Sequence, residues 1–207
     1  MLARSSDAET RLAPLTPQPN IEMRQDACTA LGHVPNTQRL GAAGRDAILR
    51  CLDDPNEAVR SAAAFAAGRR GVREAEPKLL TRMAGVPERN VIEALALLGS
   101  SNALPLIRAH AKSSGPQQSR AIRALTRFSL DPETEETLID VLSRDPDPYT
   151  MKQAGEALIE LGSVRALPAL QQFVQKFARR LAKRSRKEVF RTFPAVIERL
   201  LKTGVPL

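Results

Sequence analysis

The stretch Ala63-Ala-Phe-Ala-Ala67-Gly68 is one copy of a pattern that runs through the chain and decides its fold. In each copy a small residue stands four positions before an apolar one, and Gly or Ser follows. The other copies are Ala27-Cys-Thr-Ala-Leu31-Gly32, Ala94-Leu-Ala-Leu-Leu98-Gly99, Ala124-Leu-Thr-Arg-Phe128-Ser129 and Ala157-Leu-Ile-Glu-Leu161-Gly162. Their closing residues lie 36, 31, 30 and 33 positions apart. Each copy predicts a helix with one closely packed face, and its Gly fits the left-handed position that ends a helix.

A second landmark has the same period. Ala-x-Pro-x-Leu or a close variant occurs around Pro77, Pro105 and Pro168, and Thr134-Glu-Glu136-Thr-Leu138 fills the missing step. We therefore expect second helices there, while Pro19, Pro55, Pro87, Pro116 and Pro146 mark the first turns of the first helices. The predicted helix pairs cover residues 20–53, 54–84, 86–113, 115–145 and 146–184.

One such pair is too small to bury its own apolar stripe, so the pairs must stack into a continuous core. The sequence predicts an all-α protein, an α-solenoid of about five helix pairs. Residues 1–18 lack periodicity and are expected to be a flexible lead-in, and residues 19–184 form the solenoid. Residues 185–207 hold a basic segment and a C-terminal capping helix that starts near Pro194.

The pattern resembles the short HEAT-like repeats of the phycobilisome-lyase type. Asp54-Pro55 with Val59-Arg60, followed by Ala75-Glu-Pro77-Lys-Leu79, carries the resemblance best, and it extends over about residues 20–184. Families with this repeat include bilin lyases, protein-binding adaptors and, in a related branch, DNA glycosylases, so the resemblance defines a fold more than a function. It also implies that Arg24 and Arg60 pair with an acidic residue or a turn carbonyl of the next repeat rather than with a ligand.

The net charge of +8 is concentrated near one end of the sequence. Between Lys176 and Arg191 there are eight basic residues and one acidic residue, Glu188, whereas the rest of the chain is nearly neutral. Three interpretations remain open: a solvated helix face, a site for an acidic protein surface, and contact with nucleic acid or anionic lipid. Because the chain has 3% aromatic residues, any nucleic-acid contact should be to backbone phosphates rather than to stacked bases.

In solenoids of the resembling type the second helices line the concave face. The basic residues and His that this places there are Lys78, Arg82, Arg108, His110, Lys112 and Arg144. Together with the basic segment they form a candidate contact surface for a partner. The residues that we expect to bind it are Arg82, Arg108, Lys112, Arg144, Lys176, Arg179, Arg180, Lys183 and Lys187.

The sequence does not show a catalytic or cofactor motif. Cys28, Cys51, His33 and His110 lack the spacing of metal ligands, and both cysteines fit positions for small core residues. Two cysteines are too few for a disulfide framework. The acidic cluster from Asp131 to Glu136 stands at the start of a second helix, where the helix dipole interacts favourably with negative charge. We expect no metal, no cofactor and no enzyme activity.

The predicted function is that of a non-catalytic scaffold or adaptor that binds an acidic partner protein. The alternatives are a nucleic-acid binder of low sequence specificity and, further off, an enzyme subunit of bilin-lyase type. A glycosylase is disfavoured because the chain has one Tyr and no Trp with which to hold a displaced base. The chain has no long apolar run, so we expect no transmembrane segment and a cytoplasmic location.

Overall fold

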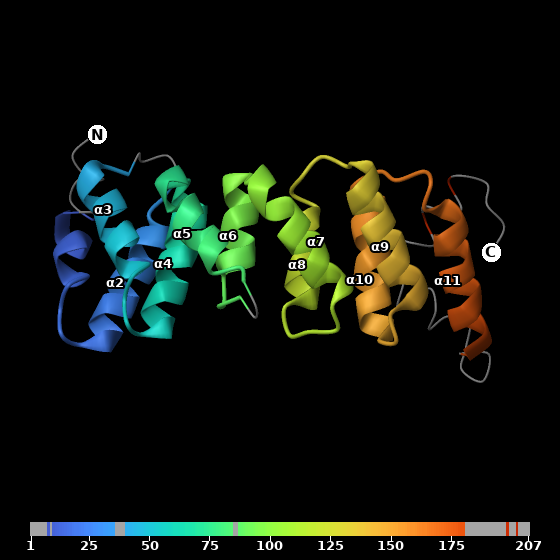
Figure 1. The fold of residues 1–207 in the computed structure, drawn as a ribbon, viewed down its shortest axis with the longest axis horizontal. Coiled ribbons are helices and arrows are strands. Elements are labelled where there is room, and N and C mark those ends of the chain that lie inside the picture. Colours follow the sequence, from blue (N-terminus) through green and yellow to red (C-terminus); the bar gives the residue numbers. More distant parts are fainter. Residues whose placement is uncertain are drawn as a thin grey trace. The chain divides into compact units, whose positions relative to one another are not determined.

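The computed structural model describes residues 8, 10–35, 40–84, 87–180, 198 and 202, and for residues 176–180 it describes the backbone only. Every regular element in this part of the chain is helical, as predicted (Figure 1). The α-helices form five pairs within the predicted ranges. They are α2 (Ile21–His33) with α3 (Ala42–Cys51), α4 (Glu57–Arg70) with α5 (Glu76–Thr81), α6 (Val91–Leu98) with α7 (Leu104–Lys112), α8 (Gln118–Leu125) with α9 (Pro132–Arg144), and α10 (Pro148–Glu160) with α11 (Leu167–Arg180).

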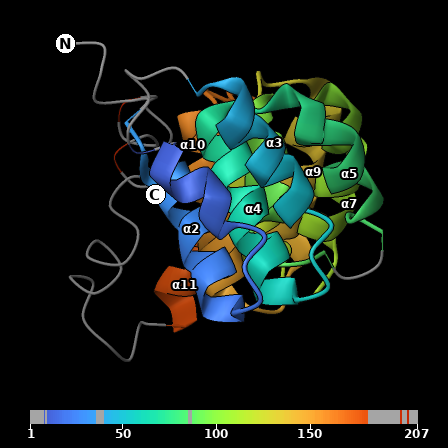
Figure 2. The ribbon, with the colours of Figure 1, turned by 90° about the vertical axis from the view of Figure 1, so that its left-hand side faces the viewer.

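The chain packs as two compact units, unit 1 from Met1 to Leu104 and unit 2 from Pro105 to Leu207. The boundary falls inside the third helix pair, so α6 belongs to unit 1 and nearly all of α7 to unit 2. In unit 1, α4 packs against α2 on one side and α6 on the other (Figure 1), and α3 lies beside α4 (Figure 2). In unit 2, α10 packs against α8 and α9, and α11 packs against α9.

The core of each unit consists mainly of aliphatic side chains, and only part of them come from the predicted stripes, whose Phe128 and Leu161 are half-buried. In unit 1 the largest fully buried side chains include Leu31, Ile48, Leu79 and Leu95. In unit 2 they are Ile107, Ile122, Leu125, Leu138 and Leu142. Burial of such side chains contributes about 1.5–3 kcal/mol each, and neighbouring helix pairs supply the apolar surface that a single pair lacks.

Part of the expected lead-in packs on the first helix pair. The short 3-10 helix η1 (Ala13–Leu15) contacts α2 and α3, and Ala13 is buried. The buried Thr16 closes this turn, because its hydroxyl donates to the Ala13 carbonyl over 2.8 Å. Residues 10–18 thus cover an end of unit 1 that would otherwise expose apolar surface. The expected C-terminal capping helix lies outside the described residues, apart from residues 198 and 202.

The glycines play two different roles. Gly99 and Gly162 have φ values of +67° and +75° and follow the last residues of α6 and α10, as predicted. The prediction is wrong for Gly32 and Gly68, which lie inside α2 and α4, and α4 ends instead at Gly71 with φ +65°. A Cβ on Gly68 would lie 2.6 Å from Ala94 Cα. These two positions require Gly because a neighbouring helix approaches too closely for a side chain.

The first helices α2, α4 and α10 begin at a polar cap rather than at the predicted marker prolines. Asn20, Asn56 and Asp147 accept hydrogen bonds from the first backbone N–H groups of α2, α4 and α10. The predicted marker prolines directly precede these caps and are not in the first turn as expected. An acceptor side chain at this position stabilises a helix start, and Pro has none to offer.

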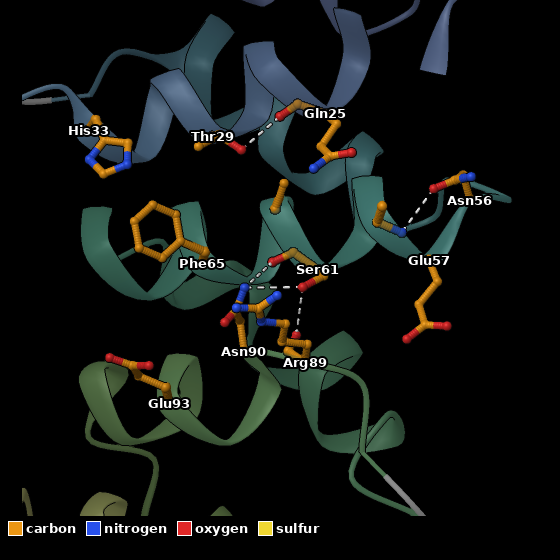
Figure 3. Close-up of a pocket in the computed structure, with 12 residues that line it drawn as sticks. Gln25, Thr29, His33, Asn56, Glu57, Ser61, Phe65, Arg89, Asn90 and Glu93 are labelled. Atoms are coloured by element: carbon orange, nitrogen blue, oxygen red, sulfur yellow. Dashed lines mark hydrogen bonds between the residues drawn. The ribbon is translucent and has the colours of Figure 1, made fainter. Parts of the chain in front are cut away.

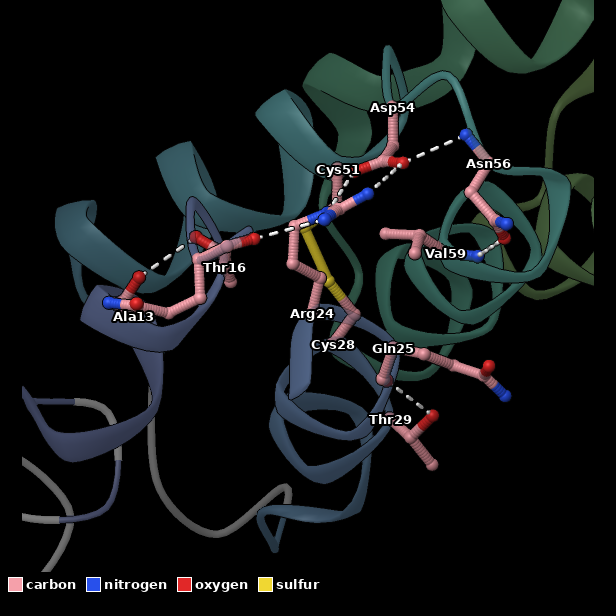
Figure 4. Close-up of a disulfide and its surroundings, with 11 residues drawn as sticks. Ala13, Thr16, Arg24, Gln25, Cys28, Thr29, Cys51, Asp54, Asn56 and Val59 are labelled. Atoms are coloured by element: carbon pink, nitrogen blue, oxygen red, sulfur yellow. Dashed lines mark hydrogen bonds and ion pairs between the residues drawn. A yellow bond between two sulfur atoms is a disulfide. The ribbon is translucent and has the colours of Figure 1, made fainter. Parts of the chain in front are cut away.

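Cys28 and Cys51 form a disulfide between α2 and α3 (Figure 4). Both are buried, as expected for small core residues, but the sequence analysis did not foresee the bond between them. Cys28 faces the partner helix from the same stripe as Ala27 and Leu31, and Cys51 is the last residue of α3. Their pairing becomes visible only once the two helices of the first pair are placed together.

Candidate functional site

An open groove of about 820 Å³ runs over the first helices of unit 1 (Figure 3). We call it the first-helix groove. Residues of α4 form its floor, and residues of α2 and of the start of α6 form its two sides. Its lining residues are Gln25, Thr29, His33, Asn56, Glu57, Ala58, Ser61, Ala62, Phe65, Arg89, Asn90 and Glu93.

Helical spacing places these side chains together. Gln25, Thr29 and His33 stand four residues apart and therefore share one face of α2. Phe65 lies opposite them on α4, because Gly32 leaves room for its ring: a Cβ on Gly32 would lie 2.8 Å from Phe65 Cε1. The ring is half-buried and contacts His33, with 5.1 Å between ring centroids, while the Arg69 guanidinium lies 5.9 Å from its centre.

A hydrogen-bond network fixes the α6 side of the groove. Asn90 has φ +72°, a left-handed conformation that Asn tolerates better than most residues. Its Nδ2 donates to the Ser61 carbonyl and hydroxyl, each over 3.1 Å, and the Ser61 hydroxyl donates to the Arg89 carbonyl over 3.0 Å. These bonds join the start of α6 to α4 and shape this wall before any ligand binds.

Arg24 and Arg60 bind within the fold, as the resemblance implied. Arg24 forms a two-pronged pair with Asp54, at 2.7 and 3.0 Å, and also donates to the Gln18 and Pro19 carbonyls (Figure 4). Arg60 stands at the equivalent position 36 residues later. Its Nε and Nη2 both donate to Oε1 of Glu88, and it also donates to the Asp54 and Pro55 carbonyls. The hydrogen bonds from Arg24 hold the pKa of Asp54 below its usual value. Each arginine thus ties one first helix to the next repeat.

Arg82 and Arg108, two of the predicted partner-binding residues, make contacts inside their own units. Arg82 donates to the Leu52 carbonyl over 2.5 Å and pairs with Glu88 over 3.2 Å. Arg108, with 12% of its side chain exposed, binds Asp131 over 2.6 Å and also Glu133 and Thr134. These contacts occupy much of both guanidinium groups.

The other predicted partner-binding residues differ in their surroundings. Lys112 is exposed at the end of α7. Arg144 is 82% exposed and pairs with Asp140 one turn earlier on α9. The backbone of Lys176, Arg179 and Arg180 belongs to α11, but their side chains are not described. Lys183 and Lys187 lie outside the described residues. The role of the basic segment in partner binding therefore stays a prediction from the sequence.

The acidic cluster near Asp131 supports a helix start, as expected. Asp131 caps α9 by accepting from the Glu133 and Thr134 backbone N–H groups. Burial alone would raise the pKa of Asp131, but hydrogen bonds from Thr134 and Arg108 outweigh it and lower the pKa. Glu135 accepts from the Ser163 hydroxyl over 2.6 Å. The cluster is thus engaged in tying helices together.

The sequence analysis missed the first-helix groove. One signal for it was present, since Gln25, Thr29 and His33 place polar groups along a single face of a predicted helix. The groove itself needs α2, α4 and α6 side by side, and its depth depends on the close approach of helices at Gly32 and Gly68.

Within the described residues, no group of three or more His, Cys, Asp or Glu side chains is placed to hold a metal ion. The same part of the chain contains no helix that is both long enough and apolar enough to span a membrane.

Consecutive helix pairs tied by repeated arginine contacts define an α-solenoid repeat protein. A family model for HEAT repeats matches residues 8–90 and 114–188, and the chain belongs to this family. No curated protein matches the chain.

Solved structures support the same fold. The complex of CpcE and CpcF of phycocyanin lyase from Nostoc sp. PCC7120 is 21% identical, with a TM-score of 0.54, and the match covers 93% of this chain and 82% of that chain. Two engineered proteins are each 17% identical. One has a TM-score of 0.60 and coverage of 95% and 97%, and the other a TM-score of 0.59 and coverage of 93% and 97%. At these identities the likeness concerns the fold alone.

Proposed function

We propose that this protein is a non-catalytic scaffold that binds an acidic partner protein through the basic segment Lys176–Arg191. The observation that carries this proposal is the charge distribution: sixteen consecutive residues hold a net charge of +7, whereas the rest of the chain is nearly neutral. Such a concentration of cations steers and holds an acidic surface. We also propose that the protein works in the cytoplasm.

The exposed basic residues of the second helices extend this surface. Lys112 and Arg144 are both exposed, and we assign them to the partner contact. We leave Arg82 and Arg108 out, because their bonds to carboxylates and carbonyls of the same unit would have to break first. Breaking a partly buried ion pair leaves a carboxylate without its partner, which opposes binding.

A protein partner and the absence of catalysis have separate support. The phycocyanin-lyase structure that this fold resembles is itself a complex of two proteins. In the described residues the carboxylates with lowered pKa are engaged in structure: Asp54 in an ion pair, Asp131 and Asp147 at helix caps, and Glu198 with Lys202. Carboxylates bound in this way stay ionised and do not serve as general acids.

Charge reversal tests the proposal. The variant R179E/R180E/K183E/K187E should lose binding to a labelled polyglutamate peptide, measured by fluorescence anisotropy at about 50 mM salt. The matched control is R50E/R73E/R123E/R127E, which reverses four exposed arginines that form no ion pair in the described part of the chain. Equal loss in both variants would show that net charge alone acts, and retained binding in the first would refute the role of the segment.

The same titration decides between the proposal and nucleic-acid binding. A labelled random DNA duplex is tested beside the peptide at about 50 and 200 mM salt. Tighter binding of the duplex, with at least a tenfold loss at the higher salt, would replace the acidic protein by a phosphate backbone. A coloured adduct on co-expression with a tetrapyrrole and an acceptor protein would instead establish a lyase subunit.

A further inference from the structure

The floor of the first-helix groove on α4 is partly apolar, with Ala58 and Phe65 beside the polar Glu57 and Ser61. Ala62 is buried and Ala58 is exposed along α4. The half-buried Phe65 ring stands at one end of the groove (Figure 3). The groove is open to solvent and runs along the helices, so it is not a closed cavity. A groove of about 820 Å³ with this form suits a short polypeptide segment, which can place one apolar side chain against the ring and its backbone along the walls.

The charges around this floor are opposite in sign to the charge of the whole chain. Glu57 and Glu93 line the groove, are exposed, and form no ion pair with any described residue. Glu22 and Asp26 lie on the ridge of α2 next to Gln25 and Thr29, and both are exposed in the same way. Against these carboxylates stand Arg89, among the lining residues, and Arg69, whose guanidinium lies 5.9 Å from the centre of the Phe65 ring. An acidic groove on a protein of net charge +8 is a local feature.

The groove is also preorganised. The bonds of Asn90 to Ser61 and of Ser61 to Arg89 fix one wall, and Thr29 donates to the Gln25 carbonyl over 2.9 Å on the other. The amide of Gln25 forms no hydrogen bond to a described residue and can therefore contact a ligand. Walls that are set before binding reduce the ordering cost of association.

We propose that the first-helix groove docks a basic amphipathic segment of a partner protein. An apolar side chain of the segment rests on Phe65, and its Lys or Arg side chains lie beside Glu57 and Glu93. The proposal goes beyond the proposed function, because it concerns another surface and a partner of opposite charge. An acidic segment is disfavoured there, since the four carboxylates of Glu22, Asp26, Glu57 and Glu93 outnumber the guanidinium groups of Arg69 and Arg89.

Two synthetic amphipathic peptides with the same Leu-rich apolar face test the proposal, one with Lys and one with Glu on the polar face. Fluorescence anisotropy with the full chain should detect the Lys peptide. Binding of the Glu peptide is expected only at the basic segment and should be absent in R179E/R180E/K183E/K187E. E57K/E93K should weaken binding of the Lys peptide at least tenfold. The control E136K/E160K makes the same charge change at two exposed carboxylates of α9 and α10 that form no ion pair in the described residues, and should change the affinity less than twofold.

Equal binding of both peptides to R179E/R180E/K183E/K187E, or equal weakening of Lys-peptide binding by both double variants, would overturn the proposal. If neither peptide binds but the chain dimerises in sedimentation and E57K/E93K abolishes the dimer, the occupant is a second copy of the chain, and the proposal is likewise refuted. The variant R179E/R180E/K183E/K187E separates this site from the basic segment, because it should still bind the Lys peptide.

Discussion

At the scale of single residues, Gly68 is under a tight packing constraint. It lies inside α4 where α6 passes, and an added Cβ would meet Ala94 at three atoms, two of them backbone atoms. A backbone cannot move aside as a flexible side chain can, so the helices would have to separate. The residue is thus Gly for reasons of space, although its backbone is ordinary helix.

Gly68→Ala should therefore lower the free energy of unfolding of unit 1 by about 1–3 kcal/mol, despite the better helix propensity of Ala. Urea denaturation followed by circular dichroism measures the change. Gly115→Ala is the control, because its nearest neighbour, Ser113 Oγ, would lie at an ordinary 3.6 Å and its φ is not positive. An unchanged midpoint for Gly68→Ala would mean that α4 and α6 do not approach as closely as described.

At the scale of helices, the arginine contacts act as ties between consecutive repeats. Arg24 and Arg60 each reach from a first helix to a carboxylate 30 or 28 residues further on, which is about one repeat. In the Arg24 tie, the side chains of Arg24 and Asp54 are 12% and 8% exposed. An ion pair with so little exposure is screened less by salt than one on the surface.

This tie predicts a pH dependence. Because the folded state lowers the pKa of Asp54 below its ordinary value of 3.8, its ionised form stabilises the fold above that pH. The contribution is lost as the pH falls through the lower, folded pKa. Asp54→Asn should therefore be less stable than the natural chain at pH 6, and the difference should shrink below about pH 4. Thermal unfolding across this range measures it, and a constant difference would contradict the tie.

The elements themselves could be predicted because their signals are local. Ala27, Ala63 and Ala157 each stand four residues before another small or apolar residue on the same face of their own helix. Such spacing depends only on nearby residues. The role of Gly68 could not be read in this way, since Gly serves both close packing and helix ends, and only the position of Ala94 separates the two. The first-helix groove and the Cys28–Cys51 bond were missed for the same reason: each joins helices whose relative placement no local pattern contains.

On the scale of the whole molecule, the division into two units limits which helices the disulfide can stabilise. Both cysteines lie in unit 1, so the disulfide restrains that unit alone. It closes a loop with a sequence separation of 23 residues, and closing a loop of this size lowers the entropy of the unfolded chain.

Reduction should accordingly destabilise unit 1 by about 3 kcal/mol and leave unit 2 unchanged. Hydrogen exchange read out by mass spectrometry, with and without a phosphine reductant, measures both units in one sample. Peptides from α2 and α4 should exchange faster after reduction, and peptides from α8 and α9 should not. Uniform acceleration along the chain would show that the two units unfold together.

The disulfide also sets how far the molecule can be drawn out under force. A chain pulled from both ends cannot extend the residues between Cys28 and Cys51, because the covalent bond bypasses them. At about 3.4 Å per residue, the sequence separation of 23 hides roughly 80 Å of contour length. A single molecule held in an optical trap would release this length only when a reductant reaches the bond.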